Sequence, residues 1–79
     1  MTAEKFRELM RAQPFVPFTI RLADGHQISV AHPDFVAASP SGRIACVFHG
    51  GEDASTFVDV MLVTAIEMNP RKANGPPDK

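Results

Sequence analysis

The chain has 79 residues, which is room for one domain. Hydrophobic residues make up 44% of it, a fraction that supports a globular core and excludes a disordered composition. The net charge of −1 gives no electrostatic bias toward nucleic acid or an anionic membrane. The single cysteine, Cys46, excludes an internal disulfide and indicates a reducing compartment.

Targeting and membrane segments are not expected. The first residues carry charges throughout and lack the apolar stretch of a secretory signal. No apolar run approaches the ~18 residues of a membrane-spanning helix. We therefore expect a cytoplasmic protein without a membrane partner. Since a core of this size without disulfide or metal often depends on a partner chain, we also expect a homo-oligomer or a complex with another protein.

Residues 2–12 are predicted to form a helix. Thr2 can cap its start, and Pro14 disfavours helical geometry at the residue before it. The spacing i, i+3, i+4 places three apolar side chains on one face: Phe6, Leu9 and Met10. A helix this short is marginal alone, so this face should pack against the sheet that follows.

Residues 18–22 and 28–30 alternate apolar and polar side chains, which is typical of strands with one buried face. The dipeptide Asp24-Gly25 between them suggests a two-residue hairpin turn. Such a turn would place Ile20 opposite Ser29, although directly opposed residues share a face of the sheet. The two-residue turn therefore conflicts with the alternation.

A three-residue loop, residues 23–25, removes the conflict because it places Ile20 opposite Ile28. It also places Gly25 at the left-handed position of a type I turn with a bulge, so we predict a positive φ there. The opposite face of this hairpin is then polar and faces solvent, with Thr19, Arg21, Gln27 and Ser29.

Further short strands separated by turn signals complete the predicted sheet. Pro33 should kink the second strand. Residues 44–48 are apolar throughout, so we expect a central strand covered on both faces. The other predicted segments are an extended run at 35–38, a turn at 39–42, an acidic loop at 50–55, a strand at 57–63, a tight corner at 64–65 and a last strand at 66–68.

The predicted fold class is mainly β (α+β), with an N-terminal helix followed by a bent five-stranded antiparallel sheet or small barrel. The domain would span residues 1–69, and the composition of residues 70–79 predicts a disordered tail. This layout, with Leu-Ala-Asp-Gly at 22–25 ending the first strand, resembles the Sm-type small β-barrels, in which a helix caps a strongly bent sheet. The resemblance implies a barrel over residues 18–68 and suggests RNA binding.

A second resemblance is carried by the segment PFVPFTIRLADGHQISVAHPDF, residues 14–35, and by the ending VTAIEM, residues 63–68. Through these segments the chain is similar to a group of small bacterial proteins of unknown function. The resemblance covers most of the chain outside the predicted tail. It implies a bacterial, cytoplasmic protein and carries no activity with it.

Candidate site residues are few. His32, Asp34 and His49 are the weak candidates for a site, and with Cys46 they could compose a mixed metal site. Their spacing matches no recognised ligand pattern, so we expect no metal and no cofactor. Cys46 lies among apolar neighbours and is expected to be a small buried hydrophobe rather than a reactive thiol.

Catalytic motifs are also not found. No Ser-His-Asp arrangement is recognisable, and Gly50-Gly51 lacks the lysine of a phosphate-binding loop. We predict a non-enzymatic protein that self-associates or binds another protein through its sheet edges. One alternative is an RNA-binding, Sm-like oligomeric ring, which the net charge and loops without aromatic residues disfavour. The other is a small ligand-binding or enzymatic protein.

Overall fold

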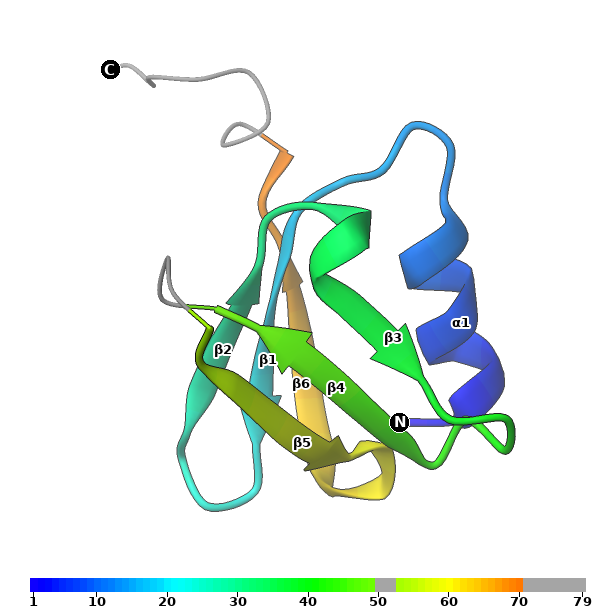
Figure 1. The fold of residues 1–79 in the computed structure, drawn as a ribbon. Helices are drawn as coiled ribbons and strands as arrows, with labels where there is room; N and C mark the ends of the chain where they lie inside the picture. The colour runs from blue at the N-terminus through cyan, green and yellow to red at the C-terminus, as the bar shows by residue number, and fades with distance from the viewer. Residues whose placement is uncertain (50–52, 71–79) are drawn as a thin grey trace.

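The computed structural model describes residues 1–49 and 53–70. These residues form one α-helix and six strands. The strands make two three-stranded antiparallel sheets, with the orders β2-β1-β6 and β3-β4-β5 (Figure 1). The mainly β, α+β class predicted from the sequence is confirmed. The elements are α1 Ala3–Arg11, β1 Phe18–Leu22, β2 Gln27–Val30, β3 Val36–Ala38, β4 Ile44–Phe48, β5 Ser55–Asp59 and β6 Val63–Met68.

The predicted helix is confirmed as α1. The Thr2 side chain accepts a hydrogen bond from the Lys5 N–H and so caps the first turn. Phe6 is fully buried, and its ring meets that of Phe18 edge to face with centroids 6.3 Å apart. The apolar face therefore anchors the helix to the core mainly through one aromatic side chain, while its neighbours Leu9 and Met10 are only partly buried.

The β1–β2 hairpin has the predicted register, with Ile20 opposite Ile28. The Leu22 N–H donates to the His26 carbonyl at 2.9 Å, which closes a three-residue loop. Gly25 in that loop has φ +94, as predicted. The register follows from the side chains, because only this pairing places every apolar residue of both strands on one face.

The expected barrel does not close. A 3₁₀ turn, Pro33–Phe35, interrupts the second predicted strand, and His32 Nδ1 accepts from the Asp34 N–H at 3.1 Å at its start. Proline has no N–H to donate to a ladder, so the chain leaves the first sheet here. The two halves, β2 and β3, belong to different sheets, and the five predicted strands become six.

The corner predicted at residues 64–65 was wrong. The chain turns earlier, in the 3₁₀ turn Val60–Leu62, where the Asp59 carboxylate accepts from the Met61 N–H at 3.0 Å. β6 then runs unbroken through the expected corner. A register shift beside Arg21 and Leu22 absorbs the bend in its ladder with β1.

Strand β4 is the central strand of its sheet, as predicted, but it is covered on one face only. Ala45 and Val47 are fully buried, whereas Ile44 and Phe48 are 39% and 48% exposed. The sequence prediction of cover on both faces was therefore wrong. An unbroken apolar run fits a two-sided strand, but in this small fold no layer lies over the second face in the described part of the chain.

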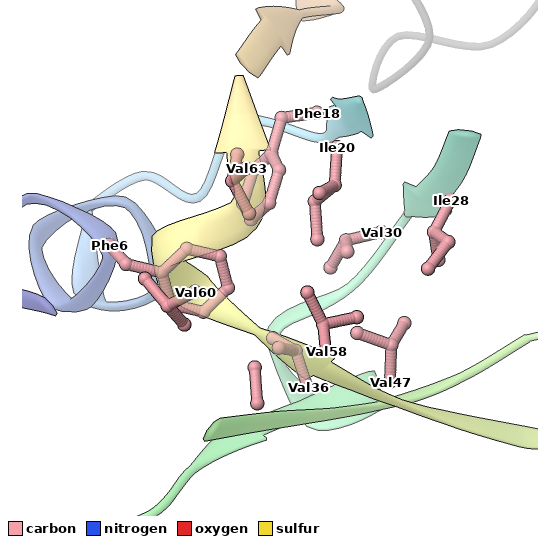
Figure 2. Packing of buried hydrophobic residues seen from close by; sticks show 11 residues of the cluster. Phe6, Phe18, Ile20, Ile28, Val30, Val36, Val47, Val58, Val60 and Val63 are labelled. Carbon is pink, nitrogen blue, oxygen red and sulfur yellow. The ribbon is translucent and has the colours of Figure 1, made fainter. Parts of the chain in front are cut away.

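The core lies between the two sheets and extends to α1 (Figure 2). Both sheets and the helix contribute side chains to the core. Because the core is shared in this way, one small cluster holds all the elements together. Its members are Phe6, Phe18, Ile20, Ile28, Val30, Val36, Ala45, Val47, Val58, Val60 and Val63. Residues 50–52 of the predicted acidic loop and residues 71–79 of the predicted tail lie outside the described residues.

Candidate functional site

The most distinctive surface is the side of the β3-β4-β5 sheet that points away from the core, called here the outer face. Pairing of Ala37 with Cys46 and of Cys46 with Phe57 forms a row across it. The same alternation that buries Ala45 and Val47 turns their neighbours outward. The apolar residues that these pairings place on the outer face are Ala37, Ile44, Cys46, Phe48 and Phe57.

The aromatic residues of the outer face are strongly exposed. Phe57 is 74% exposed and Phe48 48%. A phenylalanine side chain covers about 150–250 Å², so these two leave about 180–300 Å² of aromatic surface in contact with water. Exposed apolar surface of about 300 Å² is at the lower end of the largest patch on a typical monomer, and such patches often serve binding.

Charge is nearly absent from this surface. Among β3, β4 and β5 only Asp59 is charged, and it lies at the end of its strand. Its carboxylate is 3.9 Å from the Arg43 guanidinium, so the two charges partly neutralise each other at the rim. The result is an apolar centre with a polar rim, which is the composition of a protein interface.

The second sheet has the opposite character on its outward side. Arg21 forms an ion pair with Glu67 at 2.9 Å across β1 and β6. Thr19 is paired with Glu67 on one side and with Ser29 on the other, and its hydroxyl accepts from the Asn69 amide at 3.0 Å. This face is polar and internally paired, as the alternation of the first hairpin predicts. Within residues 1–49 and 53–70 the uncovered apolar sheet face is therefore that of β3, β4 and β5.

A groove of about 570 Å³ opens between β2 and β5, which belong to different sheets. Ile28, Val58 and Leu62 give it apolar walls. Figure 1 shows β5 starting on the same side of the molecule as β2 and running obliquely across the view. His49 lies at one end, where its Nε2 is 2.7 Å from the Thr56 hydroxyl.

Both strands beside the groove are sheet edges. The His49 N–H donates to the Ala54 carbonyl, and the Val60 N–H donates to the Arg43 carbonyl. This pattern directs the backbone N–H and C=O groups of the even-numbered residues of β5 toward β4. The backbone groups of Ser55, Phe57 and Asp59 then point away from that strand. β2 is likewise paired only with β1 in the described part of the chain. These edges are where an added strand would bind.

The weak candidates from the sequence do not form one site. His32 Nδ1 lies 3.7 Å from the Asp34 carboxylate, and its ring packs 5.6 Å from Phe35. His49 contacts Thr56 instead. Across residues 1–49 and 53–70 no group of three His, Cys, Asp or Glu side chains is placed to hold a metal ion. His32 and Asp34 thus serve the local turn.

Cys46 is not the fully buried hydrophobe expected from its neighbours. It is partly exposed in the middle of the outer face, between Ala37 and Phe57. The apolar run around it suggested burial, but alternation along β4 directs its side chain away from the core. Its thiol is consequently a natural reporter for anything that covers this face.

The hairpin loop contains a carboxyl with a lowered pKa, that of Asp24. The His26 backbone N–H donates to Asp24 Oδ1 at 3.0 Å, and the His26 ring nitrogen Nδ1 lies 2.9 Å from Oδ2. The backbone hydrogen bond, and after it the ring contact, lower the pKa of Asp24 below 3.8. Both side chains are exposed, so this contact serves the turn rather than a reaction.

Comparison of the chain with protein-family models, curated proteins and solved structures finds no match. Of the helices in the described residues, none is long and apolar enough to cross a membrane.

The sequence contained a signal for the outer face that the two-sided interpretation of β4 hid. Phe57 stands between Thr56 and Val58 in an alternating strand, so it must point opposite to Val58. Because every residue of the neighbouring strand β4 is apolar, the sheet that contains β4 and β5 has apolar residues on both of its faces. Which of the two faces the core covers depends on where the other sheet lies, and this is a tertiary property.

Proposed function

We propose that this chain is a non-catalytic interaction module that binds a protein surface through the outer face of its β3-β4-β5 sheet. The observation that carries the proposal is the exposure of Phe48 and Phe57 on one nearly uncharged face. Aromatic residues are enriched, and charged residues depleted, at the centres of protein interfaces. The outward face of the other sheet, by contrast, is polar and its charged side chains are paired, so it lacks these interface features.

The test compares two charge-introducing variants. Phe57→Lys places a charge at the most exposed aromatic position of the outer face, and Met68→Lys places the same charge at an exposed apolar position on the other sheet. We expect Phe57→Lys to abolish association and Met68→Lys to preserve it. Association is measured as solution mass by light scattering with refractive-index detection, and as proteins retained by the immobilised chain from a bacterial extract.

If wild type and Phe57→Lys have the same mass and retain the same proteins, the outer face is not an interaction surface and the proposal is wrong. Refractive-index detection is needed because the chain has neither Trp nor Tyr and absorbs weakly in the near ultraviolet.

RNA binding is the second candidate, and one observation favours it. Exposed aromatic rings on a sheet are platforms on which bases stack. Phosphate groups also require nearby cations, however, and β3, β4 and β5 contain no Lys or Arg. Nuclease-sensitive absorbance at 260 nm in the purified protein, lost in Phe57→Lys, would favour RNA over a protein partner.

A further inference from the structure

We propose that the groove between β2 and β5 binds an extended, basic segment of another protein. The segment adds to the free edge of β5 as an antiparallel strand and presents Lys or Arg side chains beside Phe57 and Asp59. This inference goes beyond the proposed function, because the site is a strand edge with its groove and not the outer face. The two proposals can therefore fail independently.

The free edge of β5 carries backbone groups that another chain can pair with. The N–H and C=O groups of Ser55 and Phe57 point away from β4, on the side where the groove lies. Such a row is a template for an added strand unless Lys, Pro or a covering element blocks it. The β5 sequence contains neither Lys nor Pro. The edge strand on the other side of the same sheet, β3, lies against α1 (Figure 1).

The groove gives the added strand a place to lie. Its volume of about 570 Å³ is within the usual range of binding pockets. Ile28 and Val58 line it and are only 8% and 2% exposed, so the groove lies over the closed core and does not cut through it. Leu62, which is 56% exposed, adds an apolar wall at the mouth. Apolar side chains of a strand in this mouth would contact Leu62.

The pairing rule fixes which side chains of the added strand point where. Directly opposed residues of an antiparallel pair share a face of the sheet. The residue that exchanges hydrogen bonds with Phe57 therefore directs its side chain to the outer face, and its neighbours direct theirs over Val58. A bound segment alternates between side chains on the outer face and apolar side chains over the core.

Charge complementarity selects basic residues for the outward positions. Asp59 shares the outer face with Phe57, and its carboxylate is 3.9 Å from the Arg43 guanidinium. So long an exposed ion pair is weak and leaves the carboxylate able to accept a second cation. The ring of Phe57 attracts a cation as well. Asp24 adds a carboxylate at the hairpin end of the groove, and among its described lining residues none is Lys or Arg.

The probe is a short synthetic peptide of alternating Lys and Val with one terminal Trp, N-methylated at each Val. The methyl groups block the peptide edge that faces away from β5 and so prevent the peptide from forming extended sheets with itself. The chain has neither Trp nor Tyr, so Trp fluorescence anisotropy reports on the peptide alone. We expect the anisotropy to rise when the chain is added, and hydrogen exchange of the Phe57 amide to slow.

Two altered peptides test the chemistry of the segment. Replacing each Lys by Glu should weaken binding about fivefold or more, because the carboxylate of Asp59 then repels the peptide. Moving the methyl groups from Val to Lys should abolish binding, because the Lys residues supply the N–H groups that pair with β5.

Three variants of the chain test the position of the segment. Ser55→Pro removes an N–H from the free edge of β5 without touching the ladder with β4, and should weaken binding about three- to tenfold. Met68→Pro removes an N–H from the free edge of β6 and is the matched control, which should bind as wild type. Asp59→Asn keeps an oxygen for the Met61 N–H and should weaken binding about two- to fivefold.

Each contrary outcome overturns a stated part of the proposal. No binding of the Lys peptide at about millimolar concentration overturns the site. Equal binding of the Glu peptide overturns the basic segment, and binding only of the peptide methylated at Lys overturns the antiparallel direction. Equal effects of Ser55→Pro and Met68→Pro, with unchanged exchange at Phe57, overturn the β5 edge. If the peptide fails while Phe57→Lys still abolishes association, the groove is excluded and the outer face stands.

Discussion

Two glycines show how single residues fix the turns of this fold. Gly25 has φ +94 and Gly42 has φ +78, conformations that side chains with a Cβ rarely adopt. Their surroundings differ: a Cβ at Gly25 would meet nothing within 4 Å, while one at Gly42 would lie 2.5 Å from Ala3 Cβ. Gly42 is therefore also the point of contact between its turn and α1.

This difference predicts unequal costs. Gly25→Ala adds only backbone strain and should lower the free energy of unfolding by about 1 kcal/mol. Gly42→Ala adds a clash with the helix and should lower it by about 2–4 kcal/mol. Urea unfolding followed by circular dichroism measures both, and equal losses would contradict the close approach of the turn to α1.

Asp24 makes the stability of the fold depend on pH. Its pKa is lower in the folded chain than in the unfolded one, because the His26 backbone N–H stabilises the carboxylate. The unfolded chain then binds more protons in acid, so this contribution to stability is present above pH 3.8 and is lost as the pH falls through the folded pKa.

We expect carboxyl NMR titration to place the Asp24 pKa below 3.8, and His26→Pro, which removes the N–H, to raise it toward that value. The control is His26→Ala, which keeps the N–H, removes only the ring contact and should raise the pKa less. An equal rise in both variants would mean that the ring, not the backbone, lowers the pKa.

At the scale of elements, α1 is held by few contacts. Phe6 is its one fully buried side chain, and Arg7 Nη2 donates to the Pro40 carbonyl at 2.7 Å. A nine-residue helix has little stability of its own, so its docking depends on this anchor.

Phe6→Ala should therefore lower the free energy of unfolding by about 3–5 kcal/mol, a large share of the total for a domain of this size. Leu9→Ala on the same helix is the control, because Leu9 is only partly buried, and should cost about 1 kcal/mol. Circular dichroism in urea measures both. Similar costs would show that the stripe, not Phe6 alone, holds the helix.

At the largest scale, the two sheets and the helix of the described residues enclose a single core, and in this part of the chain one apolar sheet face is left uncovered. Two adjacent residues of β5 lie on opposite faces of the sheet: Val58 points into the core and is 2% exposed, whereas Phe57 points outward and is 74% exposed. One residue therefore belongs to folding and its neighbour to the proposed interaction.

This contrast gives a matched pair of substitutions. At a dilution that keeps the chain monomeric, Phe57→Lys should change the free energy of unfolding by no more than about 0.5 kcal/mol. Val58→Lys puts a charge into the core and should lower it by more than about 3 kcal/mol or prevent folding. Circular dichroism in urea compares them, and a large loss in Phe57→Lys would move Phe57 into the folding core.

Local structure could be predicted from the sequence wherever the interacting residues are close along the chain or lie in one hairpin. Capping and apolar spacing placed α1, alternation selected the register of Ile20 opposite Ile28, and the loop required a positive φ at Gly25. These depend on contacts between neighbours in the chain or across one hairpin, so a local pattern contains the information.

The tertiary structure alone decided which surfaces are covered. Residues 44–48 are apolar on both faces, and the pattern could not show that one face would stay open. The break at Pro33 sends β2 and β3 into different sheets, so the barrel stays open and a groove remains beside β5. Burial depends on where distant elements come to lie, and for this chain that placement exposes the outer face.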